Sequence, residues 1–170
     1  MSKSFGDLVE QVTKCEKKTV SVCCAQDDAV LEAVRAAKEK GIVDAILVGD
    51  EAKIREIAAS INMDLSDYEI INEPDDMQAA LKAVELVHNK KADMYMKGLI
   101  DTKHFLKSVL DKEVGLRTGK PLSHVCVFDL PEVDHLLFLT DVAFIPYPTL
   151  DDKVNIINNT VEICEACGVK

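Results

Sequence analysis

The fold of this chain is decided by residues 19–48, which read TVSVCCAQDDAVLEAVRAAKEKGIVDAILV. The β-branched run at 19–24 predicts a strand, and the apolar run at 45–48 predicts another. Between them, Asp27 or Asp28 can accept hydrogen bonds from the first turn of a helix, and the apolar spacing that follows is helical. A strand, a helix and a second strand in this order predict parallel strands joined by a right-handed crossover.

The same alternation extends in both directions from this segment. Further strands are expected at 68–71 and 92–96, and helices at 5–12, 54–61, 77–88 and 102–110. The strands are almost continuously apolar, as expected for burial on both faces of a sheet. The pattern predicts a three-layer α/β/α sandwich with a mostly parallel sheet.

The pattern changes after Pro121. Residues 123–129 and 135–140 are separated by a short connection and predict an antiparallel β-hairpin. Thr149, with Asp152 three residues later, is typical of a helix start. The apolar face of that helix is formed by Val154, Ile157, Val161 and Cys164. We therefore expect a first α/β domain at 1–118 and an incomplete second domain at 119–170.

The composition argues against several classes of protein. The chain has 170 residues and a formal net charge of −10, which disfavours nucleic acid as a partner because phosphates require a large basic face. No apolar run approaches the ~20 residues of a membrane span, and the N-terminus lacks the apolar segment of a signal peptide. We expect a cytoplasmic protein that binds neither nucleic acid nor a membrane. Its six cysteines are expected to be reduced and structural, and no metal site is expected.

Residues 97–124 form a basic segment within this acidic chain. The segment holds six Lys or Arg against three acids, so it carries +3 while the remainder of the chain carries −13. An acidic protein that binds an anion has to concentrate positive charge locally, because its overall field repels the ligand. The segment predicts a site for a small ligand that carries a phosphate or a carboxylate.

Lys97 and Gly98 come at the carboxyl end of a predicted parallel strand, where ligands collect in open α/β sheets. Gly98 permits a close approach of backbone. The helix that begins near Asp101 and Thr102 offers unpaired N–H groups to an anion. The alternative is a solvated lysine beside a glycine that serves only the turn.

Arg117, Ser123 and His124 form a second cluster of side chains suited to anions. Arginine presents a planar fork to phosphate oxygens, serine adds a hydroxyl donor, and histidine titrates near neutrality. An ordinary polar loop is the alternative. Asp141 follows the second hairpin strand, where a carboxylate can orient a base, hold a ligand or only cap backbone N–H groups.

Several segments together resemble the phosphate acetyl/butyryltransferase family. They are MKGLI at 96–100, LDKEVGLR at 110–117, SHV at 123–125 and LTDVA at 139–143, with support from 25–34 and 44–50. The resemblance runs in order along the whole chain. It implies an acyltransferase that moves a short-chain acyl group, butanoyl, between CoA and inorganic phosphate: acyl-CoA plus phosphate gives acyl phosphate plus CoA.

The resemblance also implies how such a protein is built. Family members have two α/β domains of the isocitrate/isopropylmalate dehydrogenase-like kind, with the active site in the cleft between them, and form dimers or larger homo-oligomers. They use no cofactor, since CoA is a substrate, and transfer is direct within a ternary complex. The catalytic residues implied here are Arg117, Ser123, His124 and Asp141. The residues implied to bind substrate or phosphate are Lys97, Gly98, Thr102, Arg117 and Ser123.

Two departures from the family pattern stand out. Ile145 takes a place where members commonly carry Asn. Members are also about twice as long, so the resemblance identifies this chain as an N-terminal portion, expected to be nearly inactive alone. The alternatives are a non-catalytic anion-binding remnant, half of a split enzyme, or a dehydrogenase on a related scaffold. The last is weakened because the sequence has no cluster of metal-binding carboxylates.

Overall fold

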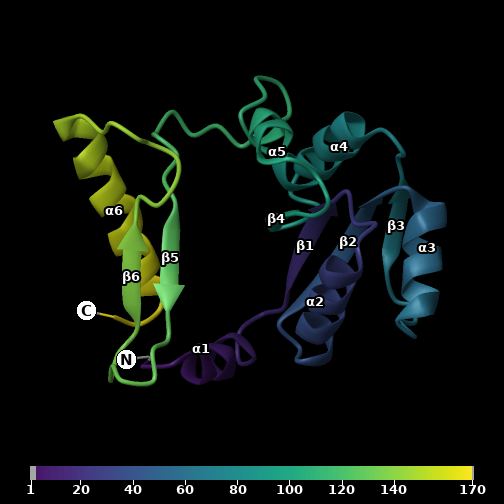
Figure 1. Ribbon diagram of the computed structural model, residues 1–170, viewed down its shortest axis with the longest axis horizontal. Helices are drawn as coiled ribbons and strands as arrows, with labels where there is room; N and C mark the ends of the chain where they lie inside the picture. The colour runs from purple at the N-terminus through teal and green to yellow at the C-terminus, as the bar shows by residue number, and fades with distance from the viewer. Residues whose placement is uncertain (1–2, 170) are drawn as a thin grey trace. The chain divides into compact units, whose positions relative to one another are not determined.

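The computed structural model describes residues 3–169, which fall into two compact units. One unit comprises residues 15–117 and is called the sheet unit below. The other comprises 3–14 together with 118–169 and is called the hairpin unit. Figure 1 labels the helices and strands of both units and colours them by residue number.

The sheet unit is built on four parallel strands in the order β3-β2-β1-β4. The strands are β1 (Lys18–Cys23), β2 (Val43–Gly49), β3 (Glu69–Asn72) and β4 (Met94–Lys97). The helices are α2 (Asp28–Glu39), α3 (Glu51–Ser60), α4 (Asp76–His88) and α5 (Thr102–Val109). The prediction of an α/β fold with a mostly parallel sheet is confirmed, and each observed strand lies within two residues of its predicted start.

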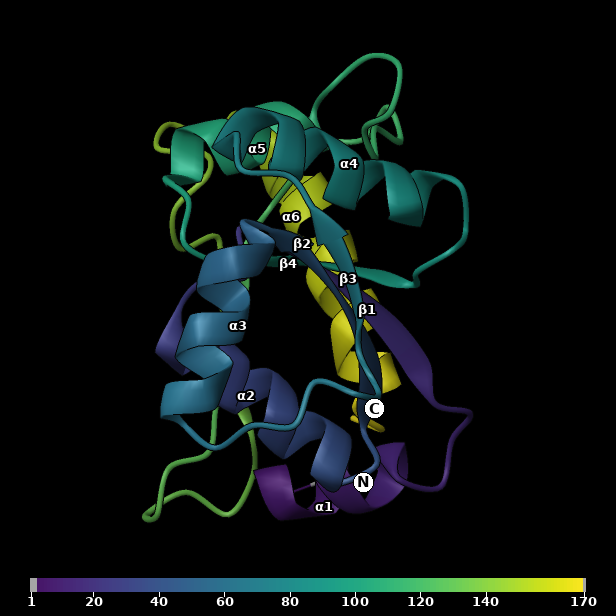
Figure 2. The same cartoon turned by 90° about the vertical axis from the view of Figure 1, so that its right-hand side faces the viewer.

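Two clusters of buried side chains lie on opposite faces of this sheet. One includes Val22 and Leu47 and packs against Leu31 of α2 and Ile54 of α3. The other includes Ile46 and Val48 and packs against the alanines of α4, Ala79, Ala80 and Ala83. Successive strand residues point to opposite faces, so a strand that is apolar at every position feeds both clusters. Figure 2 shows α2 and α3 on the other side of the strands from α4.

The helix starts follow the aspartates that the sequence singles out. The Asp27 side chain accepts a hydrogen bond from the Val30 N–H at 3.0 Å, and Asp75 accepts one from the Gln78 N–H at 2.9 Å. These bonds satisfy donors that have no partner within the helix. They fix where the chain turns from the carboxyl end of a strand into the next helix.

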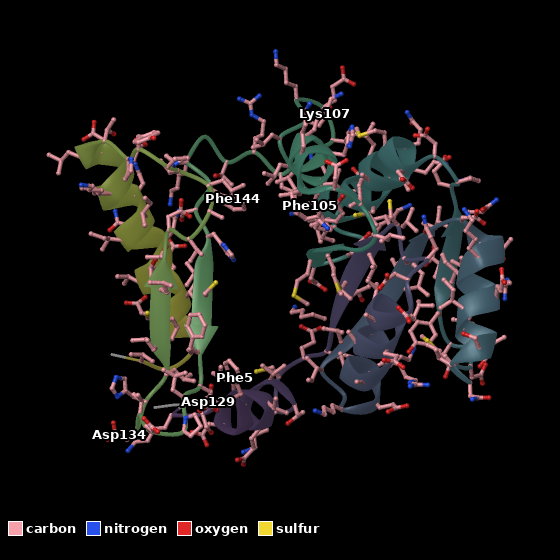
Figure 3. All side chains as sticks on the ribbon, in the orientation of Figure 1. Phe5, Phe105, Lys107, Asp129, Asp134 and Phe144 are labelled. Atoms are coloured by element: carbon pink, nitrogen blue, oxygen red, sulfur yellow. The ribbon has the colours of Figure 1, made fainter. Side chains whose placement is uncertain are left out.

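The hairpin unit consists of α1 (Phe5–Val12), β5 (Val125–Phe128), β6 (Leu137–Thr140) and α6 (Leu150–Ala166). Strands β5 and β6 are antiparallel, which confirms the predicted hairpin. Helix α1 groups with this unit rather than with the first domain, where the sequence analysis placed it. The contact is non-local: the Phe5 N–H donates to the Asp129 carboxylate at 2.8 Å, and Figure 3 labels both residues.

The apolar stripe predicted on the last helix faces solvent. Val154, Ile157 and Val161 are 47–59% exposed, and Leu150, one turn earlier on the same stripe, is 77% exposed. The side of α6 that packs on β6 is a different one, on which Ile156 is buried. The hairpin therefore packs against the side of α6 that holds Ile156 and leaves most of the apolar stripe uncovered.

This arrangement gives a matched pair of substitutions. Ile156→Ala is expected to lower the free energy of unfolding by about 2 kcal/mol, because it removes buried methyl groups from the contact with the hairpin. Ile157→Ala changes the same residue type one position later and is expected to cost only a few tenths of a kcal/mol, since Ile157 is 59% exposed. Urea unfolding of both variants measures the difference. Equal losses would contradict the orientation of α6.

Within residues 3–169, no helix combines the length and apolarity needed to cross a membrane.

Candidate functional site

The residues predicted to bind substrate lie on both units. Lys97, Gly98, Thr102 and Arg117 belong to the sheet unit, and Ser123, His124 and Asp141 belong to the hairpin unit. Each group is described on its own unit.

The sheet unit has a hollow of about 790 Å³ at the carboxyl ends of its strands, lined in part by Lys97 and Gly98. The strand order places β2 on one side of β1 and β4 on the other, so the chain reverses direction across the sheet at β1. Lys97 is the last residue of β4, beside this reversal. Reversals of this kind are where open α/β sheets hold their ligands.

Gly98 is required by the packing of two turns. Its N–H donates to the Cys23 carbonyl at 2.9 Å, and the next N–H, of Leu99, donates to the Cys24 carbonyl at 2.8 Å. A Cβ at position 98 would overlap both of these carbonyl oxygens. The sequence analysis expected a close backbone approach at Gly98, and the backbone that approaches is that of residues 23–24.

The hollow is lined by two lysines, Lys53 and Lys97, and by three aspartates, Asp75, Asp76 and Asp101. Lys53 is paired with Asp50 at 3.2 Å, and the Lys97 ammonium makes only a 3.4 Å contact with the Gly98 carbonyl. Lys97 is therefore the cation in this hollow without an ion-pair partner among the described residues.

The start of α5 is less open to an anion than the sequence analysis expected. Asp101 caps the helix and accepts the His104 N–H at 2.9 Å, and it also binds the His104 ring. The His104 N–H and ring lower the pKa of the Asp101 carboxyl, so a negative charge occupies this helix start at neutral pH. Thr102, the first residue of α5, is left with an exposed side chain beside that charge.

Arg117 is the last residue of the sheet unit and is exposed. Its guanidinium has no hydrogen-bond or ion-pair partner anywhere in residues 3–169. A free fork of this kind can bind two oxygens of a phosphate or a carboxylate.

A buried thiol that the sequence analysis treated as structural lies beneath the Gly98 turn. Cys23 is fully buried at the end of β1. The neighbouring Cys24 thiol, the Tyr95 hydroxyl and the Gly98 backbone outweigh the effect of burial and lower the pKa of Cys23.

On the hairpin unit, Asp141 caps three backbone N–H groups. One carboxylate oxygen accepts the N–H of His124 at 2.7 Å, and the other accepts those of Phe144 at 3.1 Å and Ile145 at 2.6 Å. Burial tends to raise the pKa of Asp141, but these hydrogen bonds outweigh it and hold the pKa below its ordinary value of 3.8. Among the roles considered for Asp141, the contacts show capping.

The backbone of His124 is held by hydrogen bonds to Asp141 and Thr140. The Thr140 hydroxyl donates to the His124 carbonyl at 3.0 Å, so both backbone groups of His124 are held. Its ring lies 5.6 Å from that of Phe144, and its Nε2 lies 3.6 Å from the Cys126 sulfur. Its Nδ1 is buried without a hydrogen-bond partner in the described part of the chain.

Ser123 lies in a hollow of about 490 Å³ that also includes Asn159 of α6. The Asn159 amide donates to the Ser123 hydroxyl oxygen at 2.9 Å and to the Pro121 carbonyl at 3.3 Å. The sequence analysis missed Asn159. Asn159 lies three residues after Ile156, so the two share one side of α6. This spacing would have pointed to Asn159 only if the side of α6 that packs on the hairpin had been known.

No group of three or more His, Cys, Asp or Glu in the structurally described residues could hold a metal ion.

Comparison with known proteins assigns the chain to a family. A family model described as phosphate acetyl/butaryl transferase matches residues 4–80 and 69–170. The phosphate butyryltransferase of Clostridium acetobutylicum is 58% identical over 170 residues, which is 100% of this chain and 56% of that protein. The phosphate butyryltransferase of Clostridium beijerinckii is 56% identical over 169 residues, which is 99% of this chain and 56% of that protein. The chain therefore spans little more than half the length of these relatives.

A solved structure agrees. The branched-chain phosphotransacylase from Enterococcus faecalis superposes with a TM-score of 0.70 at 27% identity, covering 87% of this chain and 51% of that one. The family model extends across both units, from residue 4 to residue 170. On this evidence, the chain belongs to the phosphate acetyl/butaryl transferase family.

Proposed function

We propose that this chain binds phosphate and acyl phosphate as part of an acyltransferase that moves a butanoyl group between CoA and inorganic phosphate. The observation that carries the proposal is the 58% identity, over all 170 residues, to a protein named phosphate butyryltransferase. Free cationic groups at Lys97 and Arg117 support it, because phosphate, acyl phosphate and CoA are all anions.

In the acyl-phosphate-consuming direction, the CoA thiol loses its proton and the thiolate attacks the acyl carbonyl. The C–S bond forms, the bond between the carbonyl carbon and the phosphate oxygen breaks, and phosphate leaves with its electron pair. Negative charge on the departing phosphate is stabilised by donors already in place. We assign this role to Lys97 and Arg117 of the sheet unit and to the Ser123 hydroxyl of the hairpin unit. Gly98 fixes the turn beside Lys97, and the exposed Thr102 side chain adds to phosphate binding. No cofactor takes part, because CoA is itself a substrate.

His124 and Asp141 have a different part in this proposal. The Asp141 carboxylate fixes the backbone of His124 at 2.7 Å, which sets the position of the residue next to Ser123. We propose that Asp141 orients this turn and that the His124 ring contributes to binding acyl phosphate.

The same family membership supports three further proposals. The sheet unit follows the isocitrate/isopropylmalate dehydrogenase-like scaffold, and the hairpin unit belongs to a second domain. The protein is a dimer or a larger homo-oligomer. It acts in the cytoplasm.

A second candidate is phosphate binding without turnover, since the unpaired cations Lys97 and Arg117 support anion binding by themselves. An assay with butanoyl-CoA and phosphate separates the two. Thiol release in proportion to protein supports acyl transfer. Phosphate binding measured by calorimetry without thiol release supports the second candidate. Failure of both measurements would overturn the proposal.

Arg117→Ala is expected to weaken phosphate binding by at least about tenfold, seen as a higher KM or a higher Kd. This is the usual contribution of a hydrogen bond to a charged group. Lys112→Ala is the matched control, since it removes an exposed cation from the same basic segment without a proposed role. Unchanged values for Arg117→Ala would remove that residue from the site.

A further inference from the structure

The Ser123 hydroxyl is constrained by the amide of Asn159. The amide nitrogen lies 3.3 Å from the Pro121 carbonyl oxygen, which can only accept a hydrogen bond. The atom facing Pro121 must therefore be the NH₂ group rather than the amide oxygen. The second hydrogen of this NH₂ group points to the Ser123 hydroxyl oxygen at 2.9 Å.

This contact fixes the direction of the Ser123 hydrogen bond. Because the oxygen accepts from Asn159, the hydroxyl hydrogen remains for a different acceptor. No carbonyl or carboxylate within residues 3–169 takes it. The hydroxyl is therefore a donor without an acceptor among the described residues of this hollow. The cation Lys120, which also lines the hollow, is paired with Glu162 at 3.7 Å.

We infer that Asn159 is a positioning residue that commits the Ser123 hydroxyl to donate to an oxyanion. The inference rests on the proposed function, because the oxyanion is the phosphate or acyl phosphate bound there. A serine that is free to rotate can satisfy itself on a neighbouring carbonyl. Asn159 limits this, because the serine hydrogen cannot point toward the NH₂ group from which its own oxygen accepts.

The decisive experiment is a double-mutant cycle on the affinity of the whole chain for inorganic phosphate, measured by calorimetry. Asn159→Ala is expected to lower the affinity for phosphate about fivefold, because the serine hydroxyl loses its fixed direction. Asn159→Asp is expected to weaken it more than tenfold, since a carboxylate only accepts and takes the serine hydrogen for itself. In the Ser123→Ala background, Asn159→Ala is expected to cause no further loss, because it acts through Ser123.

Asn158→Asp is the matched control. It places the same charge one residue earlier on the same helix, at an exposed position with no recorded hydrogen bond. It is expected to change phosphate affinity less than twofold. Thermal unfolding of each variant separates loss of folding from loss of the serine contact, because a purely structural role for Asn159 would lower stability equally with and without Ser123.

The outcomes distinguish the inference from the function beneath it. If Ser123→Ala weakens phosphate but Asn159→Ala does not, or if Asn159→Ala weakens phosphate equally in both backgrounds, the inference is overturned and the function stands. If the unaltered chain shows no affinity for phosphate, or Ser123→Ala has no effect, the proposed phosphate site is wrong and the inference fails with it.

Discussion

Gly98→Ala is expected to lower the free energy of unfolding by about 3 kcal/mol, at the upper end of overpacking effects. The added methyl group would meet the carbonyl oxygens of Cys23 and Cys24, and neither can move away. Cys23 belongs to the central strand β1 and pairs with Val48 on one side and Lys97 on the other. Relief of the overlap would therefore disturb two strand pairs.

Gly41→Ala is the control for this prediction. Gly41 also lies in the sheet unit and has a left-handed backbone with φ +71°, but a Cβ there meets nothing within 4 Å. Its replacement is expected to cost only about 1 kcal/mol, the price of the backbone conformation. Urea unfolding measures both. A loss for Gly98→Ala no larger than that for Gly41→Ala would show that the two turns are not packed as described.

Asp141→Asn is expected to lower the free energy of unfolding by about 2–3 kcal/mol above pH 4. The carboxylate accepts three backbone N–H groups, whereas an amide keeps one oxygen and turns an NH₂ group toward a donor. At least one half-buried N–H is then left unpaired. The effect falls on the turn that carries His124, so a loss of phosphate affinity should accompany it.

The pH dependence of this prediction follows from the lowered pKa of Asp141. A carboxyl whose pKa is lower in the folded protein stabilises the fold fully above its ordinary value of 3.8. That contribution is lost as the pH falls through the lower pKa of the folded state. The difference in stability between the unaltered protein and Asp141→Asn should therefore be constant above pH 4 and shrink below it. Asp151→Asn, at an exposed position in the first turn of α6, is the control and should lower the free energy of unfolding by less than about 1 kcal/mol.

Local patterns in the sequence were sufficient to predict the helices and strands. The aspartate and threonine side chains that begin the helices are visible without a structure, and the capping box of Thr149 with Asp152 forms as expected. The parallel sheet follows from strands that are mostly apolar and alternate with helices. These features depend on neighbours a few residues apart, which is why periodicity finds them.

The errors concern contacts between distant residues. Helix α1 joins the hairpin through a hydrogen bond between residues 124 positions apart, and no local pattern encodes that choice. The apolar face predicted on α6 is left largely exposed, and the sequence does not say which side of the helix the hairpin covers.

Within the candidate site, too, residues with a local sequence signal were predicted, and a residue that depends on a distant contact was not. Lys97 and Gly98 were placed at a strand end by pattern alone, and the structure puts both in the hollow there. Asn159 was missed because its partner, Ser123, is 36 residues away. The neighbouring Asn158 is the same residue type, but it lies on the exposed side of the helix.

The exposed stripe on α6 has a thermodynamic consequence for the hairpin unit. The heat capacity change of unfolding grows with the apolar surface that becomes hydrated. Leu150, Val154 and Ile157 are already half or more hydrated in the folded protein, so melting α6 hydrates them little further. The hairpin unit should therefore melt with a smaller heat capacity change per residue than the sheet unit, and its stability should vary less steeply with temperature.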